Sequence, residues 1–426
     1  MKENKYHFAT NAVHAGYSPD SETGSSSVPI YQTNSFVFDT TDTAANRFNL
    51  TEPGNIYSRL SNPTVDVLDK RVAALEGGVA GVSVATGQSA EMTAILNIVQ
   101  SGENFVSSSS IYGGSYTLFR YTMEQMGIEA RFANTSDPAS FEALIDDNTK
   151  AIYGETIGNP RLDVFPFEEV SKIAKKYGIP LIIDNTMASP YICKPLELGA
   201  DIVIHSASKY LGGHGTTLGG VIVDKGTFNW NNSRFPIMTE PDISYHGMKW
   251  FKDMGDFAYI NKARLKLLRD TGCAMSPFNA FTILLGIETL PLRMQKHSEN
   301  AMEIATFLEA HNKVEWVIYP GLSSHADHKN AKKYFNNGFS GMIGFGVKGG
   351  RNAGKTFIDS TTLCSHLANI GDAKTLVIHP ASTTHNQLSK EELVAAGVSE
   401  DFIRLSVGIE DARDIIEDIT QALEKI

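Results

Sequence analysis

A chain of 426 residues is too long for one small core and suits two sizeable domains with extensions. Hydrophobic residues make up 42% and charged residues 20% of the sequence, which excludes a disordered chain. A net charge of -11 argues against binding to the nucleic-acid backbone, which needs a basic face, so we expect no nucleic-acid partner.

The sequence carries no signal for export or for a membrane anchor. Residues 1–16 contain no apolar core of the kind found in signal peptides, and no stretch reaches the roughly 18 uninterrupted apolar residues of a membrane span. Cys193, Cys273 and Cys364 are odd in number and far apart, which predicts free thiols rather than a disulfide framework. We therefore expect a cytoplasmic protein without a membrane partner.

The first 60 residues predict an arm rather than a domain. They are rich in Ser, Thr, Asn, Gly and Pro and show little periodicity. The pattern changes at Ser61, where cap-type residues precede a run that ends at a Gly pair and places four apolar residues on one helical face: Val65, Leu68, Val72 and Leu75. This run predicts the first helix of a domain that we assign to residues 61–260.

Short apolar runs alternate with amphipathic helical patterns through this domain. The helical patterns cover 90–99, 116–126 and 166–178, and the apolar runs predict strands at 82–86, 104–108, 151–156, 180–185, 201–206 and 219–224. Alternation of this kind predicts an α/β fold, with a largely parallel sheet covered on both faces.

Near residue 257 the alternation of strand and helix patterns gives way to a long helical pattern that continues to about Leu290. Strand-like runs at 314–320, 342–347, 375–379 and 402–407 then alternate with helical stretches. This part predicts a smaller α/β domain, which we assign to residues 261–426.

Two polar residues follow strands of the first domain, where ligands of open α/β sheets bind. Asp184 comes directly after the apolar run LII and is either a helix cap or a buried partner for a protonated ring nitrogen. Lys209 follows DIVIH within HSASKYLGGHG and is either a solvated surface amine or an amine whose lowered pKa lets it attack an aldehyde.

Three further residues have both a structural and a functional interpretation. Gly87 lies in TGQSA, between a strand and a helix, where free amides favour an anion, although ordinary turn chemistry explains it as well. Tyr112 is either a core tyrosine or an aromatic that stacks on a flat heterocycle. Arg404, inside an apolar run, must find an anion, which is either a substrate carboxylate or a structural acid.

In their order and combination these segments resemble the Cys/Met-metabolism family of pyridoxal-phosphate enzymes. The similarity covers nearly the whole chain and is carried by YSRLSNPT (57–64), GQSAEM, YGGSY, GNP, DNT, SASKYLGGHG, HPASTTH and RLSVGIED. The resemblance implies an aspartate-aminotransferase-like fold (fold type I) with a mostly parallel seven-stranded sheet. It also implies pyridoxal 5'-phosphate as the cofactor, with no metal, and a homotetramer built as a dimer of dimers.

The resemblance implies a role for each matched residue. Lys209 would hold the cofactor aldehyde as a Schiff base, Asp184 would pair with the pyridinium nitrogen, and Tyr112 would stack on the ring. Either Tyr57 or Tyr112 would assist proton transfer. The phosphate would be bound by Gly87, Gln88, Ser206 and Ser208, with Tyr57 and Arg59 from the neighbouring subunit. The substrate carboxylate would be held by Asn159 and Arg404, with Thr375 in the substrate-side loop.

Within the family, the segments 234–250, 286–301 and 366–389 are similar to those of members that transfer sulfide. They imply γ-replacement, in which sulfide or methanethiol displaces acetate from O-acetyl-L-homoserine to give L-homocysteine or L-methionine. Cystathionine γ-synthesis and γ-elimination remain alternatives, and Gly114 departs from the γ-lyases, which carry cysteine there. A nicotinamide-dependent oxidoreductase is a further alternative, but the sequence lacks the G-x-G-x-x-G fingerprint. A non-catalytic binding protein would not need Lys209, Asp184 and Tyr112 together.

Overall fold

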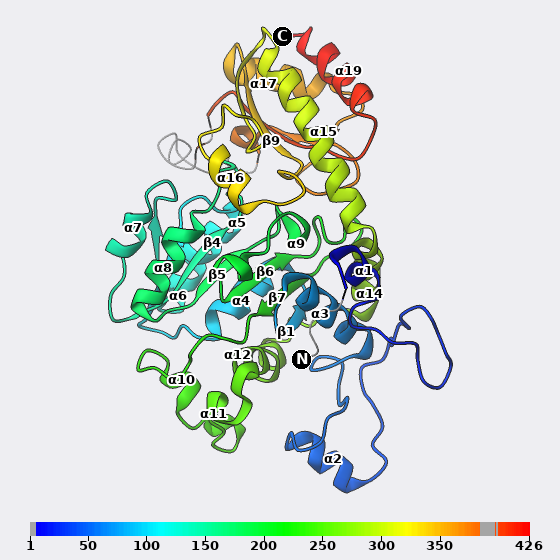
Figure 1. Cartoon of the computed structure of the whole chain (residues 1–426), viewed down its shortest axis with the longest axis vertical. Helices are drawn as coiled ribbons and strands as arrows, with labels where there is room; N and C mark the ends of the chain where they lie inside the picture. Colours follow the sequence, from blue (N-terminus) through cyan, green and yellow to red (C-terminus); the bar gives the residue numbers. More distant parts are fainter. Residues whose placement is uncertain (1–5, 384–396, 398) are drawn as a thin grey trace.

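The computed structural model describes residues 6–383, 397 and 399–426, which fold around two β-sheets of unequal size (Figure 1). Two segments discussed above extend beyond this range: residues 1–5 of the amino-terminal segment, and residues 384–389 of the family-like segment 366–389. The smaller sheet and the carboxyl terminus lie at one end of the long axis, and helix α2 lies at the other.

The larger sheet has seven strands in the order β1-β7-β6-β5-β4-β2-β3. Only β7 runs against the others, because it pairs antiparallel with β1 and β6 while the pairs from β6 to β3 are parallel. The predicted mostly parallel sheet is therefore confirmed. Its strands are β1 (Ala80–Val84), β2 (Asn104–Ser108), β3 (Glu129–Ala133), β4 (Thr149–Glu155), β5 (Leu181–Asp184), β6 (Ile202–Ser206) and β7 (Gly220–Asp224).

One strand of this sheet, β3, was missed in the sequence. It lies at the sheet edge and pairs only with β2, so its sequence EARFA is only partly buried. An edge strand does not need the continuous apolar run that marks the central strands, such as β5, which is buried along its length.

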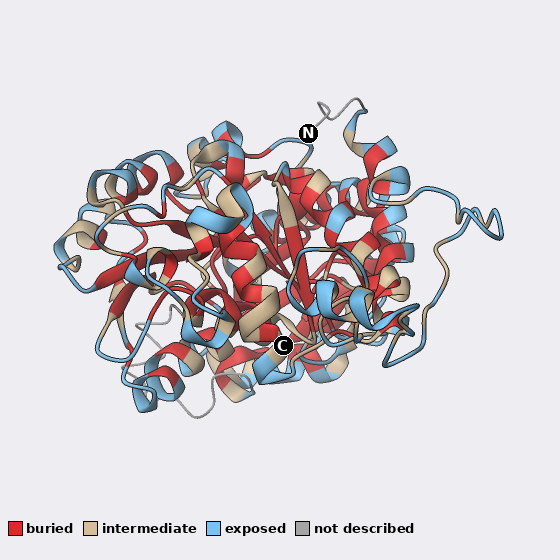
Figure 2. Ribbon diagram, turned by 90° about the horizontal axis from the view of Figure 1, so that it is seen from below, coloured by how far each residue is buried: buried red, intermediate tan, exposed pale blue. Residues whose placement is uncertain are grey.

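Helices pack on this sheet and link its strands. The predicted first helix is α3 (Pro63–Glu76), which begins after the capping side chain of Asn62 and ends at Gly77, in the left-handed conformation with φ 83°. The other helices up to β6 are α4 (Gly87–Leu96), α5 (Gly113–Thr117), α6 (Met123–Gln125), α7 (Pro138–Ala143), α8 (Phe167–Tyr177) and α9 (Ser189–Ile192). Buried residues gather in the strands between them, which are red in Figure 2.

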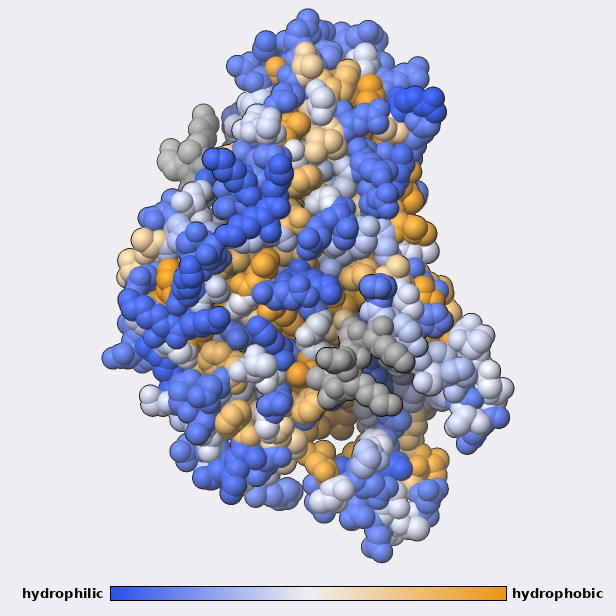
Figure 3. Space-filling view, viewed as in Figure 1, coloured by the Kyte–Doolittle hydropathy of each residue, from blue (hydrophilic) through white to orange (hydrophobic). Residues whose placement is uncertain are grey.

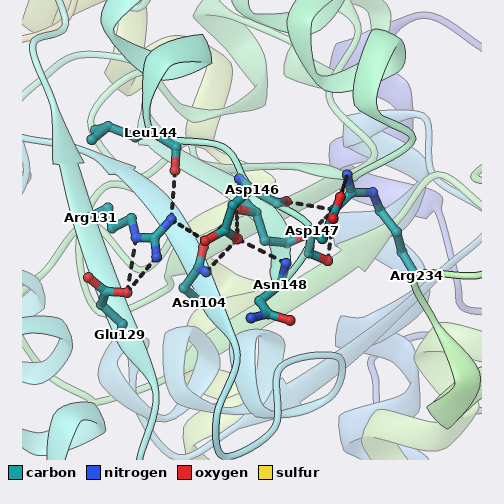
Figure 4. Close-up of polar contacts among 9 residues, drawn as sticks. Asn104, Glu129, Arg131, Leu144, Asp146, Asp147, Asn148 and Arg234 are labelled. Carbon is teal, nitrogen blue, oxygen red and sulfur yellow. Dashed lines mark hydrogen bonds and ion pairs between the residues drawn. The ribbon is translucent and has the colours of Figure 1, made fainter.

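The family-like segment 234–250 attaches to the sheet at the amino ends of its strands. Figure 4 shows Arg234 pointing toward the turn before β4, where its Nη1 donates to the carbonyl oxygens of Asp146, Asp147 and Thr149 at 2.9, 3.1 and 3.1 Å. Arg131 also binds the Asp146 carboxylate, at 2.8 Å. The helices that follow β7 are α10 (Pro236–Thr239), α11 (Trp250–Met254), α12 (Ala258–Lys262), α13 (Arg269–Thr271) and α14 (Pro277–Glu288).

The smaller sheet has five strands in the order β10-β11-β12-β9-β8. Its strands are β8 (Val314–Ile318), β9 (Met342–Val347), β10 (Ser365–His366), β11 (Leu376–Ile378) and β12 (Phe402–Ser406), and its helices are α15 (Leu290–Ala310), α16 (His328–Tyr334), α17 (Gly350–Ser360) and α19 (Ala412–Leu423). This confirms the predicted second α/β unit, apart from the two-residue strand β10. The division of the chain at residues 60 and 260 stays a prediction.

Residues 6–60 contain two short helices, α1 (Phe8–His14) and α2 (Thr41–Phe48), joined by a long connecting segment. Figure 3 shows α2 and its flanking chain standing off from the body across a hollow. Apolar side chains lie uncovered there, with Val37 exposed at 92% and Phe48 at 64%. Among the described residues, no helix has both the length and the apolar character of a membrane span.

Candidate active site

A cavity of about 230 Å³ lies at the carboxyl ends of β4, β5 and β6 and at the amino end of α4. The smaller sheet closes one side of it with β12 and the loop 368–370. Most of the predicted site residues line this cavity: Gly87, Gln88, Tyr112, Asn159, Asp184, Ser206, Ser208, Lys209 and Arg404.

Lys209 lies in the turn that follows β6. Its amine donates to Oδ1 of Asn369, on the loop from the smaller unit. Burial lowers the pKa of this amine below its ordinary value, and the positive charge of Arg404 lowers it further. A larger fraction of the amine is therefore unprotonated at neutral pH, which is the form that reacts with a carbonyl carbon and accepts a proton.

Asp184 is the last residue of β5 and is buried. Its Oδ1 accepts the amide of Thr186 at 2.7 Å, and Oγ1 of Thr186 accepts the amide of Ser206 at 2.7 Å, which ties the end of β5 to the end of β6. Burial raises the pKa of the Asp184 carboxyl, although the hydrogen bonds from Thr186 oppose this. A buried carboxylate of this kind is stabilised by a cationic partner in the cavity.

The amino end of α4 provides a place for an anion. Thr86 caps this ten-residue helix by accepting the amide of Ser89 at 3.0 Å, and Gly87 begins it. A Cβ added to Gly87 would lie 2.7 Å from the Cβ of Ser206, so only glycine permits this close approach of α4 to β6. The free amides of the first turn and the hydroxyl groups of Ser206 and Ser208 border the same part of the cavity.

Tyr112 and Arg404 face the cavity from different elements. Tyr112 precedes α5, its ring is 48% exposed, and its amide donates to Oε1 of Glu155 at 2.6 Å. Arg404 lies on β12, and its Nη1 donates to Oδ1 of Asn159 at 3.3 Å. Burial lowers the pKa of Arg404 to about 10, so the guanidinium remains charged at neutral pH. A buried guanidinium that meets an amide at its edge can accommodate a carboxylate.

The structure adds site residues that the sequence reasoning missed: Glu91, Glu155, Thr186 and Asn369. Burial, together with the charge of Asp184, raises the pKa of Glu91 to about 8 and that of Glu155 well above its ordinary value. Glu155 ends strand β4 just as Asp184 ends β5, so the same rule of polar residues at strand ends identifies it. Asn369 lies in the family-like segment 366–389, but nothing in that segment predicts its contact with Lys209, because it reaches Lys209 from a loop 160 residues away.

Three predicted residues do not line the cavity of this chain. Arg59 is exposed, donates to the carbonyl of Arg269 at 3.1 Å, and lies 5.4 Å from the ring of Tyr57. Thr375 is fully buried, and its Oγ1 donates to Glu410 at 2.9 Å and accepts the amide of Gly408 at 2.9 Å. Within the described residues Thr375 therefore has structural partners, and the neighbouring-subunit role of Tyr57 and Arg59 stays a prediction.

Comparison with known proteins identifies the kind of enzyme that this cavity belongs to. The model of the Cys/Met metabolism PLP-dependent enzyme family matches residues 9–424. The chain belongs to this family. It is therefore an enzyme that depends on pyridoxal phosphate.

Individual relatives are similar over nearly their whole length. An O-acetyl-L-homoserine sulfhydrylase from Leptospira meyeri is 55% identical, over 98% of this chain and 96% of that protein. A homocysteine synthase from Schizosaccharomyces pombe is 50% identical, over 98% of each chain. A crystal structure of a Campylobacter jejuni protein that carries N'-pyridoxyl-lysine-5'-monophosphate is 44% identical, with a TM-score of 0.96, and covers 98% of this chain and 100% of that one.

The side chains of the cavity fit this cofactor. Pyridoxal phosphate presents an aldehyde, a ring nitrogen and a phosphate group, and the cavity offers a chemically matched partner for each. Lys209 is an amine with a lowered pKa, Asp184 is a buried carboxyl, and the first turn of α4 beside Ser206 offers free amides. The crowding at Gly87 shows that a side chain does not fit at the first position of this turn.

Proposed function

We propose that this enzyme catalyses replacement at Cγ of O-acetyl-L-homoserine. Sulfide takes the place of acetate and gives L-homocysteine, and methanethiol in place of sulfide gives L-methionine. The observation that carries the proposal is a cavity that combines Lys209, Asp184 and Arg404 in a chain 55% identical to an O-acetyl-L-homoserine sulfhydrylase. This activity places the enzyme in methionine and cysteine biosynthesis.

Pyridoxal phosphate, when bound, draws electron density from the amino-acid substrate and so makes its α-proton acidic. Lys209 links the enzyme covalently to the cofactor and, once free, accepts the proton from Cα and returns it. Its lowered pKa suits both tasks, because the amine is needed as a free base. Asp184 pairs with the ring nitrogen and keeps it protonated.

Other residues bind and orient the reactants. Gly87, Gln88, Ser206 and Ser208 bind the phosphate, and Tyr112 stacks on the ring and faces the reacting carbons. Arg404 from the smaller sheet and Asn159 from the chain after β4 hold the substrate carboxylate, and the 3.3 Å bond from Nη1 of Arg404 to Oδ1 of Asn159 keeps the two side chains together. Arg404 therefore sets the position of Cα beside Lys209.

Product analysis tests the reaction directly. O-acetyl- and O-succinyl-L-homoserine are each offered sulfide, methanethiol or cysteine, and homocysteine, methionine and cystathionine are quantified. We expect O-acetylhomoserine with sulfide to be the preferred pair. Efficient cystathionine formation with little homocysteine would instead assign the enzyme to cystathionine γ-synthesis, and release of a keto acid without added thiol would indicate γ-elimination.

We further propose that each site is shared between subunits of a cytoplasmic homotetramer, arranged as a dimer of dimers. The uncovered Val37 and Phe48 support an arm that packs on a neighbouring chain. In that arrangement Arg59 and Tyr57 reach the neighbour's phosphate, which accounts for their exposed position here. The free thiols Cys193, Cys273 and Cys364 suit a reducing compartment.

Mixing two inactive variants tests the shared site. Arg59→Ala and Lys209→Ala subunits are each expected to be inactive alone, yet to regain activity when subunits exchange. A hybrid dimer has one site with both defects and one with neither. Random exchange makes about half of the dimers hybrids, so about a quarter of wild-type activity is the ceiling. Demonstrated exchange without any recovery would show that Arg59 serves its own chain.

A further inference from the structure

Arg293, outside the cavity, holds the turn that carries Lys209. Arg293 lies near the start of α15 and is only 5% exposed. Its Nη1 donates to the carbonyl of Tyr210 at 2.8 Å, and its Nη2 donates to the carbonyls of Leu211 and Gly286 at 3.3 and 2.6 Å. Its Nε donates to Oγ1 of Thr289 at 3.2 Å, and no carboxylate pairs with this guanidinium within the described part of the chain.

The turn itself is built to receive this side chain. The amide of Gly213 donates to the Lys209 carbonyl at 2.7 Å, which closes the turn. Gly213 has φ +72°, and a Cβ there would lie 2.2 Å from Nη1 of Arg293. The position therefore requires glycine twice over, once for its backbone and once for the guanidinium.

The same face of α15 also holds the chain that leaves β12 after Arg404. His297 and Asn300 follow Arg293 at i+4 and i+7, so the three side chains lie along one face of the helix. Nδ1 of His297 donates to the carbonyl of Val407 at 2.7 Å, and Nδ2 of Asn300 donates to the carbonyls of Gly408 and Glu410 at 3.1 and 2.7 Å. Burial keeps His297 neutral by lowering its pKa to about 4, which fits a ring that donates through Nδ1 alone.

We propose that Arg293, His297 and Asn300 form a polar ridge on α15 that sets the position of Lys209 relative to Arg404. At one end of the ridge Arg293 binds the main chain just after Lys209. At the other end His297 and Asn300 bind the main chain that follows Arg404. Figure 1 shows why a single helix can do this, since α15 runs from the larger unit at α14 into the smaller one beside α19. The ridge residues are positioning residues, because none of them lines the cavity.

If the ridge positions Lys209 and Arg404, its loss has two effects that a purely structural role in the fold would not have. Releasing the turn moves the Lys209 amine away from Arg404 and toward water, so its pKa rises and less free base is present at neutral pH. Loss of the Arg293 contacts therefore acts on kcat. Loss of the Asn300 contacts loosens the chain after Arg404 and acts on KM for the amino acid.

The test uses Arg293→Lys, which keeps a charge but cannot present the same planar donors to three carbonyls. We expect kcat to fall by about tenfold or more, with a small change in KM. The pH midpoint for labelling of the Lys209 amine with trinitrobenzenesulfonate, followed by peptide mapping of the full-length chain after removal of the cofactor, should move to higher pH. Asn300→Ala should raise KM for the amino acid and leave that midpoint unchanged. Thr289→Val removes the hydroxyl group that accepts the 3.2 Å bond from Nε of Arg293 and donates to the carbonyl of Gly286 at 3.2 Å, and it should act like Arg293→Lys but more weakly.

Arg71→Lys is the matched control. Arg71 is also a buried arginine that donates to a main-chain carbonyl, that of Ala15 at 2.9 Å. It differs from Arg293 in that it also pairs with a carboxylate, that of Glu288 at 3.6 Å, and it lies on α3 and does not line the cavity. Its substitution should lower the melting temperature and leave kcat and the midpoint unchanged. A folded Arg293→Lys protein with normal kcat and an unmoved midpoint would overturn the ridge, as would equal shifts in Arg71→Lys. The inference rests on the proposed function for the roles of Lys209 and Arg404, but the labelling midpoint is independent of which amino acid is the substrate.

Discussion

Replacing Lys209 with alanine is expected to abolish turnover while leaving the fold in place. Among the described residues Lys209 is the lysine that lines the cavity, and alanine removes both the covalent link to the cofactor and the base at Cα. A positioned general base alone contributes about 10²- to 10⁴-fold to rate, so a loss at or beyond the upper end of that range is expected. Lys209 as a whole residue is only partly buried and its partner Asn369 is polar, so the cost in stability should be small.

Borohydride reduction followed by peptide mapping locates the cofactor. In the wild-type enzyme the reduced pyridoxyl group should be found on Lys209, and in Lys209→Ala no lysine should carry it. Lys225→Ala is a suitable control, because its amine donates to the carbonyl of Leu196 at 2.8 Å and does not line the cavity. A pyridoxyl group on another lysine in the wild-type protein would contradict the assignment.

The central strands were predictable because burial on both faces leaves a continuous apolar run in the sequence. Strands β5 and β6 end at Asp184 and Ser206, so the rule that ligands bind at the carboxyl ends of parallel strands also located the site. The edge strand β3 escaped because one side of it has no neighbour and its residues need not be apolar. The hydrophobic pattern of the sequence therefore predicts the central strands of the sheet better than its edge strands.

Some of the residues that sequence reasoning missed act across long sequence separations. Asn369 reaches Lys209 from a loop of the smaller unit, and Arg293 holds the same turn through main-chain carbonyls, which leave no pattern in the sequence. The segment 234–250 shows the opposite case. It is distinctive in sequence, yet Arg234 fixes it at the amino ends of the strands, and no residue of the segment lines the cavity. A segment that is typical of one group of relatives therefore need not contact the substrate directly.

Replacing Asp184 with asparagine is expected to lower turnover by about 10²- to 10³-fold, the range for removal of one preorganised electrostatic contact. An amide has nearly the size of the carboxylate and can still accept the 2.7 Å bond from Thr186, but it cannot balance the charge of a protonated ring nitrogen. The free energy of unfolding of Asp184→Asn should not fall together with its turnover. Burial raises the pKa of Asp184, so ionising it in the folded chain is unfavourable, and the uncharged amide removes that cost above the unfolded pKa.

Asp224→Asn separates this role from the general effect of removing a buried acid. Asp224 also ends a strand and is buried, and burial raises its pKa to about 7. Because β7 runs antiparallel to β6, Asp224 lies at the amino ends of the parallel strands, whereas Asp184 lies at their carboxyl ends. Between the unfolded pKa and about 7, the folded state binds more protons than the unfolded state, so stability falls as pH rises and asparagine relieves this loss. In the cofactor-free chain both variants should therefore melt at or slightly above the wild-type temperature at neutral pH, while in the cofactor-loaded enzyme only Asp184→Asn loses turnover. Near-normal kcat in cofactor-loaded Asp184→Asn, or an equal loss in Asp224→Asn, would remove Asp184 from the proposed chemistry, because the effect would then follow from burial and not from a charge facing the cofactor.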